Sequence, residues 1–213
     1  GSDSGYFFSL NAKTGKEQWR MKADGPIYAS AAAADERIFV TTKGGQAHAL
    51  SAASGEVQWS FSTNAPIVSS PAVDDDIVTF GGDSHFQYAV DAETGEEIWK
   101  FRTSAKIKSS AVHDGSRIIF TSDDGYVYCI ESDSGVKLWE YATEGQIPSP
   151  PVMGSGDIVY VASLDGFIHA IDADDGERYW KKEVEDQIVA PMLMHGDRLY
   201  YTTMKGELKA LDD

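Results

Sequence analysis

The chain is short of cysteine and of positive charge. Its single cysteine, Cys129, excludes an internal disulfide bond and any metal site built from several thiolates. Lys and Arg number 18 against 34 Asp and Glu, so the formal net charge of the 213 residues is −16. Nucleic acids and anionic membrane surfaces are bound by clustered cations, so this charge argues against both as partners. Because no stretch approaches the roughly 18 to 20 apolar residues that cross a bilayer, we also expect no direct membrane insertion.

A repeat of about 40 residues organises the chain. The five tryptophans are separated by 40, 40, 40 and 41 residues, each with a glycine four residues before it and an isoleucine eight residues after it. Three markers that keep the same phase indicate a structural repeat. The tryptophans are Trp19, Trp59, Trp99, Trp139 and Trp180, the glycines are Gly15, Gly55, Gly95, Gly135 and Gly176, and the isoleucines are Ile27, Ile67, Ile107, Ile147 and Ile188.

Each repeat has the pattern of four β-strands. Residues 67–73 and 77–80 are short apolar runs on either side of an acidic turn, and 86–90 and 96–101 flank the turn 91–95. No window of 11 or more residues keeps the 3.6-residue apolar spacing of a helix. A four-stranded unit that is apolar on both faces cannot bury itself alone, so copies must stack on one another. We therefore predict an all-β fold, a β-propeller of four-stranded blades.

The strand pattern begins and ends inside a blade. It opens with a third strand at 5–10 and a fourth at 16–21, runs through four complete blades, and closes with the first three strands of another. We expect about five blades in a single domain over 1–213, closed by pairing of the terminal strands in a seam that joins 5–22 with 188–212. Residues 5–10 are expected to take the third place in that seam because their hairpin is local, and the second copy, 206–211, then frays or pairs with another chain.

Two segments carry a family resemblance. Residues 89–99 and 170–180 resemble the A-x-D-x-x-x-G-x-x-x-W tryptophan-docking motif of PQQ-type β-propeller repeats. That family includes quinoprotein alcohol dehydrogenases and the outer-membrane assembly lipoprotein BamB. The resemblance implies that the five tryptophans and their glycines dock one blade on the next, and that the protein is periplasmic or otherwise extracytoplasmic. It does not imply an activity, because the motif is structural.

The residues that quinoprotein dehydrogenases use cannot be assigned in this chain. Those enzymes need a vicinal cysteine pair, a calcium ion held by carboxylate and amide, and a catalytic aspartate, whereas this chain has one cysteine and two asparagines, Asn11 and Asn64. The acidic segment 172–177 lacks the downstream glutamate of a calcium loop. His85 replaces the glycine that begins the third strand in every other copy, and the sequence offers no reason for it. We therefore predict no catalytic residue, no metal ligand and no cofactor, and hence no enzyme.

Copy-specific polar residues gather in the connectors between repeats. Connectors from fourth to first strands should emerge on the same face as the loops between second and third strands, and variable loops on a rigid framework are common binding sites. We predict a non-catalytic scaffold for protein–protein interaction, either BamB-like or an extracytoplasmic sensor domain. The alternatives are a quinone (PQQ)-dependent dehydrogenase fragment and an engineered or fragmentary structural propeller without activity of its own. The candidate partner-binding residues are Lys106, Lys108, Asp24, Asn64, Glu144, Gln146 and Glu185.

Overall fold

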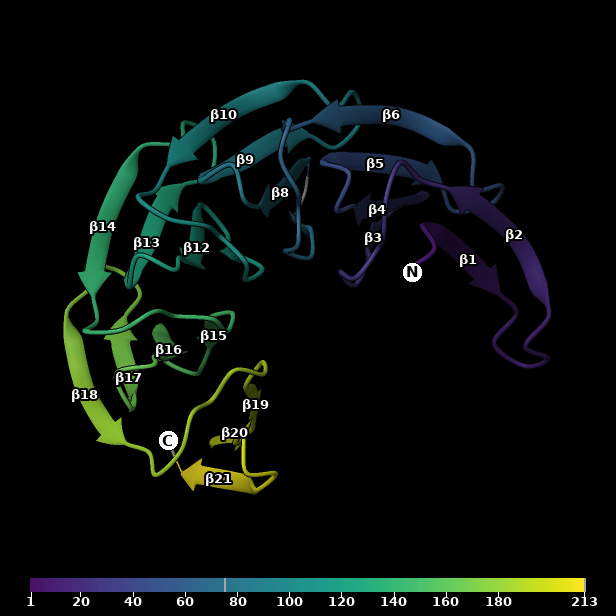
Figure 1. Ribbon diagram of the computed structural model, residues 1–213. Helices are drawn as coiled ribbons and strands as arrows, with labels where there is room; N and C mark the ends of the chain where they lie inside the picture. Colours follow the sequence, from purple (N-terminus) through teal and green to yellow (C-terminus); the bar gives the residue numbers. More distant parts are fainter. Residues whose placement is uncertain (75, 213) are drawn as a thin grey trace. The chain divides into compact units, whose positions relative to one another are not determined.

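The computed structural model describes residues 1–74 and 76–212 (Figure 1). These residues form 21 strands in six antiparallel sheets of two, four, four, four, four and three strands in chain order. The predicted all-β class and the predicted strand pattern are confirmed. In this part of the chain, no helix is long and apolar enough to span a membrane. Backbone contacts divide the chain into unit 1, Gly1–Arg102, and unit 2, Thr103–Asp213.

Unit 1 holds a two-stranded sheet and two four-stranded sheets. Each four-stranded sheet is a meander in which strands adjacent in sequence pair with each other. The strands are β1 (Tyr6–Leu10), β2 (Glu17–Lys22), β3 (Ala32–Ala34), β4 (Arg37–Thr41), β5 (Gln46–Ser51), β6 (Val57–Ser62), β7 (Ala72–Asp74), β8 (Ile77–Gly81), β9 (Phe86–Asp91) and β10 (Glu97–Arg102).

Unit 2 holds two four-stranded sheets and a three-stranded sheet with the same meander order. Its strands are β11 (Val112–Asp114), β12 (Arg117–Thr121), β13 (Tyr126–Glu131), β14 (Lys137–Ala142), β15 (Val152–Met153), β16 (Ile158–Ala162), β17 (Phe167–Asp172), β18 (Arg178–Glu183), β19 (Leu193–His195), β20 (Arg198–Thr202) and β21 (Leu208–Asp212).

The first strand of each sheet is shorter than the sequence predicts. The predicted strand 67–73 is reduced to β7, and only an isolated bridge between Ile67 and Gly82 precedes it. Between them the Ser69 hydroxyl donates to the carbonyl of Gly81 and accepts from its N–H, both at 2.8 Å. A side chain thus takes the place of strand pairing there, and Pro71 has no N–H to donate. The acidic turn predicted after this strand includes Asp75, which lies outside the described residues.

The turn between third and fourth strands is stabilised by its own side chains. Asp91 Oδ1 accepts hydrogen bonds from the backbone N–H groups of Thr94 at 2.7 Å and Glu93 at 3.0 Å. The bond from Thr94, more than any other cause, lowers the pKa of the Asp91 carboxyl. Gly95 completes the turn with a φ of 74°, in the left-handed region that glycine enters without steric cost. In the first repeat Asn11 takes the position of Asp91, and its Oδ1 accepts from the backbone N–H groups of Lys13 and Thr14.

The sheets stack face against face. We call the face that packs on the following repeat the forward face, and the one that packs on the preceding repeat the backward face. In unit 1 the forward face of β3–β6, with Phe39 and Trp59, packs on the backward face of β7–β10, with Phe80 and Val90. In unit 2 the β11–β14 and β15–β18 sheets pack in the same way. Sheet-on-sheet packing of this kind buries the apolar residues that a single blade leaves exposed.

The last sheet contains its own third strand. β21 pairs with β20 over five residue pairs, whereas β1 pairs only with β2 in a separate sheet. The prediction that 5–10 takes the third place and leaves 206–211 unpaired is therefore wrong. The reason is that the hairpin from β20 to β21 is as local as the one from β1 to β2, so loop closure favours both equally. Among the described residues no sheet joins the two ends of the chain, and a single domain over 1–213 with a closed seam stays a prediction.

The structure explains why a glycine begins the third strand. Five glycines there have φ between 75° and 93°, and His85 takes a φ of 64° at the same place. A Cβ on Gly45 would lie 2.7 Å from the carbonyl oxygen of Ala65, so two constraints favour glycine in that repeat. The five are Gly5, Gly45, Gly125, Gly166 and Gly206.

We expect His85→Gly to raise the free energy of unfolding by about 0.5 to 1 kcal/mol. A non-glycine residue in the left-handed region costs about 1 to 2 kcal/mol, and the substitution relieves this cost. The larger conformational entropy of glycine in the unfolded chain offsets part of the stabilisation. Urea denaturation monitored by tryptophan fluorescence measures the difference. Gly45→Ala is the matched control and should destabilise. Destabilisation by His85→Gly would contradict the strain argument.

Candidate interaction surface

One edge of each sheet gathers the connectors and the loops. In a four-stranded meander the second and fourth strands run in the same direction, so their carboxyl ends lie at the same edge. This edge carries the loop from second to third strand and the connector that joins one repeat to the next. In unit 2 we call this edge the connector surface, made of connectors 103–108, 143–148 and 184–189 and loops 122–125, 163–166 and 203–206.

A hydrogen bond that recurs in every repeat holds loop and connector together. In each of five repeats a backbone N–H of the loop donates to a carbonyl of the connector before it, at 2.8 to 3.0 Å. Because these polar groups are paired, the connector backbone has a defined position at the edge of its sheet. The five bonds run from Lys43 to Pro26, Asp83 to Pro66, Asp123 to Lys106, Leu164 to Gln146 and Met204 to Gln187.

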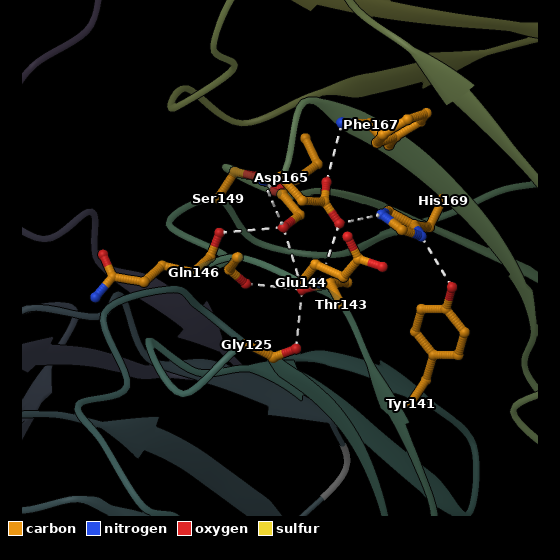
Figure 2. A network of polar contacts seen from close by, with 12 residues as sticks. Gly125, Tyr141, Thr143, Glu144, Gln146, Ser149, Asp165, Phe167 and His169 are labelled. Atoms are coloured by element: carbon orange, nitrogen blue, oxygen red, sulfur yellow. Dashed lines mark hydrogen bonds and ion pairs between the residues drawn. The ribbon is translucent and has the colours of Figure 1, made fainter.

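Asp165 adds a second attachment for connector 143–148 (Figure 2). Its Oδ2 accepts from the backbone N–H of Glu144 at 3.2 Å, and its Oδ1 accepts from the N–H of Phe167 at 3.0 Å. The hydroxyl of Thr143 donates to the carbonyl of Gly125 at 2.9 Å. The connector is thus held by side chains as well as by the backbone.

His169 extends this network into the core between two sheets (Figure 2). Its Nε2 lies 3.0 Å from Asp165 Oδ2, and its Nδ1 lies 2.9 Å from the hydroxyl of Tyr141. A neutral imidazole with the proton on Nε2 satisfies both contacts, since the tyrosine O–H then donates to Nδ1. The His169 and Asp165 side chains are only 3% and 5% exposed. Burial lowers the pKa of His169, and the nearby Asp165 carboxylate opposes that shift.

The same pairing of loop and third strand occurs in a second repeat, and the sequence did not reveal it. The hydroxyl of Tyr128 donates to Asp124 Oδ2 at 3.0 Å. His48, at the same third-strand position in unit 1, instead lies 3.6 Å from the connector residue Asp24, beyond hydrogen-bond distance. Burial also lowers the pKa of His48. An aspartate four residues before a histidine or tyrosine, as in 165–169 and 124–128, is the sequence signal that could have revealed the network.

The predicted partner-binding residues lie on this edge in each unit. In unit 1 Asp24 and Asn64 are exposed, and in unit 2 Glu144, Gln146 and Glu185 are exposed. The structure therefore brings three of them to the connector surface with side chains directed to solvent. Their partners differ: the carboxylate of Glu185 lies 3.2 Å from Lys209 Nζ, and the hydroxyl of Thr42 donates to Asp24 Oδ1 at 2.8 Å.

The two lysines of connector 103–108 differ in their surroundings. Lys108 Nζ lies 2.5 Å from Asp123 Oδ2, so a carboxylate at the same edge balances its charge. Lys106 is half-buried, and its carbonyl oxygen accepts from the backbone N–H of Asp123. Both lysines therefore contact loop 122–125. The positive charge that connector 103–108 presents to a partner is smaller than the sequence suggests.

The tryptophans contact the turn of the following repeat. Trp59 Nε1–H donates to the carbonyl of Ala92 at 3.0 Å, and Trp139 Nε1–H donates to that of Ala173 at 2.9 Å. A Cβ on Gly95 would lie 2.6 Å from the indole of Trp59. Gly55, Gly95 and Gly176 can thus serve two purposes, a positive φ for their own turn and room for the indole of the repeat before. The docking role of all five pairs stays a prediction.

The chemistry of quinoprotein dehydrogenases does not fit the residues described. Asn11 Oδ1 is taken up by its own turn, where it accepts from the N–H groups of Lys13 and Thr14. Burial raises the pKa of the Cys129 thiol to about 12. Over residues 1–74 and 76–212, no three or more His, Cys, Asp or Glu side chains are grouped to hold a metal ion. The described residues therefore offer no cluster of carboxylates that would hold the calcium ion of those enzymes.

The repeat geometry agrees with a comparison to known families. A family model described as outer membrane protein assembly factor BamB matches residues 4–87, 72–155 and 146–213. The chain belongs to this family. The predicted PQQ-type repeats are thereby confirmed, and the three overlapping matches are what a chain of similar repeats should give. No curated protein sequence matches the chain significantly.

Two solved structures show how far the likeness to BamB repeats extends. The crystal structure of BamB from Moraxella catarrhalis has a TM-score of 0.85 at 18% identity and covers 99% of this chain and 65% of its own. The crystal structure of the computationally designed Ika8 protein has a TM-score of 0.90 at 15% identity and covers 99% of this chain and 66% of its own. At such identities the likeness shows the fold alone. The chain spans just under two thirds of the length of each structure.

Proposed function

We propose that this BamB-family chain is a non-catalytic scaffold that binds a protein partner through the connector surface of unit 2. The family is described as an outer membrane protein assembly factor. By extension from that description, the partner is a protein of outer membrane assembly and the location is periplasmic.

One observation carries the proposal. The connector backbones are held by the same hydrogen bond in every repeat, yet their outward side chains differ from copy to copy. A recognition surface requires variable side chains on a rigid backbone, since binding a partner then costs little conformational entropy. In unit 2 the corresponding pairs of positions are Ser104 and Lys106, Glu144 and Gln146, and Glu185 and Gln187.

Crosslinking at Glu144 tests the proposal directly. A photoreactive amino acid at 144, introduced into cells that express the protein, should give a discrete protein adduct. Lys106→Glu with Lys108→Glu should weaken that adduct by about tenfold, because charges at an interface set orientation and encounter. Immunoblots of the adduct and thermal melts of each variant are the measurements.

Two matched controls come from the opposite edge of the β11–β14 sheet. A photoreactive residue at the exposed Asp133 should give no such adduct. Lys137→Glu disrupts a comparable ion pair, with Lys137 Nζ 2.7 Å from Glu140, and should leave the adduct unchanged. Equal adducts at 144 and 133 would contradict the assignment of the surface. Saturable quinone binding with calcium and alcohol-dependent dye reduction would contradict the non-catalytic role.

A further inference from the structure

One oxygen of Asp165 links connector 143–148 to a buried histidine (Figure 2). Asp165 Oδ2 accepts from the backbone N–H of Glu144, and the same oxygen accepts from the Nε2–H of His169. The bond from Glu144 is the longest that the carboxylate accepts, at 3.2 Å against 3.0 Å for the bonds from His169 and Phe167. A change in the charge of His169 therefore acts directly on the oxygen that holds the connector.

The preceding repeat of unit 2 has the same arrangement with a tyrosine in place of the histidine. Asp124 Oδ2 accepts from the backbone N–H of Ser104 at 2.9 Å and from the hydroxyl of Tyr128 at 3.0 Å. Burial and the Asp124 carboxylate raise the pKa of Tyr128 above its ordinary value, so this hydroxyl stays protonated in neutral and acidic solution. The two repeats therefore attach their connectors alike, and they differ in whether the side chain that shares the aspartate oxygen can change its charge.

The second ring nitrogen of His169 has a partner that is specific to its repeat. The hydroxyl of Tyr141 lies 2.9 Å from Nδ1, and the two rings pack edge to face with their centroids 5.6 Å apart. In unit 1 the same two repeat positions hold Phe61 and Tyr88, whose rings also pack edge to face, at 5.4 Å. The packing is thus common to both repeats, whereas the hydroxyl of Tyr141 is added where a histidine nitrogen can accept from it.

Charged groups of opposite sign act on His169. Asp165 of loop 163–166 favours the protonated ring, and Lys181 and Arg178 of β18 oppose it. β14 contributes the neutral hydroxyl of Tyr141, and β16 contributes an apolar residue opposite His169 in the sheet. Burial is the largest influence and lowers the pKa of His169, so the ring is neutral at pH 7 and takes up a proton in acid.

Protonation changes both contacts of the ring. The bond from Nε2–H to Asp165 becomes a bond between two charges, which is shorter and stronger than one from a neutral ring. The positive charge also reduces the negative potential at Asp165 Oδ2, so this oxygen becomes a weaker acceptor for the N–H of Glu144. At Nδ1 the added N–H faces the hydroxyl of Tyr141, which then turns and accepts. The bond to the connector, which is already the longest, is the one that weakens.

We propose that connector 143–148 responds to pH, because protonation of His169 releases the N–H of Glu144 from Asp165. The backbone bond from Leu164 to Gln146 contains no titratable group and remains. The connector thus stays attached at residue 146 and becomes freer at residue 144. Binding to a freer connector costs more conformational entropy, so a partner on the connector surface should bind less tightly in acid. This last consequence rests on the function proposed above.

An NMR titration of the free protein from pH 8 to pH 5 tests the proposal. The amide proton of Glu144 should shift upfield as the pH falls, because its hydrogen bond weakens, and its midpoint should equal that of the His169 ring protons. The amide proton of Ser104, held by Asp124, should not follow this midpoint. In His169→Tyr the response of Glu144 should be lost. Because no partner is present, the result does not depend on the proposed function.

Two exposed lysines of β18 provide a matched pair of variants that leaves the network itself intact. Lys181 opposes protonation of His169, so Lys181→Gln should move the midpoints of His169 and Glu144 to higher pH together. Lys182 points to the opposite face of the strand, so Lys182→Gln should leave both midpoints unchanged. Circular dichroism checks the folding of each variant at each pH. A Glu144 amide that does not titrate with His169, a response that survives in His169→Tyr, or a Glu144 midpoint that stays in place when Lys181→Gln moves that of His169 would each overturn the proposal.

Discussion

Replacing Trp139 with Ala is expected to lower the free energy of unfolding by about 3 to 5 kcal/mol. The indole is buried between the β11–β14 and β15–β18 sheets, where it joins Ile119 and Val159 in one apolar cluster. Truncation leaves a cavity between two sheets that are close-packed at this point, and it removes the donor to the Ala173 carbonyl. Urea denaturation with circular dichroism as the signal measures the loss.

Two comparisons separate docking from simple loss of volume. Trp19 is half-buried, so Trp19→Ala should cost less than Trp139→Ala. Gly95→Ala introduces a methyl group 2.6 Å from the Trp59 indole, whereas a methyl group on Gly15 meets nothing within 4 Å. Both glycines have a positive φ, so both alanine variants carry backbone strain. Gly95→Ala and Gly15→Ala therefore differ in the contact with an indole. If Trp139→Ala unfolds at the urea midpoint of the parent, the docking role of the tryptophans is wrong.

The repeat markers predicted the fold because each reports a local requirement. Gly95 marks a turn that needs a positive φ, and Trp99 marks the strand that follows it. Gly95 also leaves room for the Trp59 indole of the repeat before, but the turn and the strand after it follow from local backbone conformation, so the order of strands could be predicted without the structure. The third-strand glycine belongs to the same class, which is why His85 stands out at its φ of 64°.

The contacts of the candidate surface could not be predicted in the same way. Whether Asp165 reaches both Glu144 and His169 depends on how a loop folds over a connector, and the repeat pattern does not encode that. Lys108 was predicted to be a partner-binding cation, but its distance to Asp123 is a property of the folded edge. The extent of the first strands was overestimated because Ser69 replaces strand pairing with side-chain bonds.

Asp165→Ala is expected to lower the free energy of unfolding by about 3 kcal/mol at pH 8. The carboxylate accepts from His169 Nε2 and from two backbone N–H groups, and each buried donor left without an acceptor costs about 1 to 3 kcal/mol. Asp165→Asn keeps one acceptor oxygen and should cost less. Equal stability of the alanine variant and the parent would contradict a structural role for the network.

The cost of Asp165→Ala should grow as the pH falls from 8 to 5.5, and the sign follows from His169. Burial holds the folded-state pKa of His169 below the ordinary 6.5, so its neutral form contributes stability that is complete above pH 6.5 and is lost as the pH falls through the folded pKa. The Asp165 carboxylate raises that folded pKa and so limits the loss. Without the Asp165 carboxylate the folded-state pKa of His169 drops further. The unfolded chain then takes up the His169 proton over a wider range of pH in which the folded chain does not. Urea titrations at several pH values should show this steeper loss.

In a His169→Tyr background the extra pH dependence should vanish, since tyrosine stands at this position in two other repeats and stays neutral over this range. Persistence of the steeper loss without His169 would show that another group is responsible.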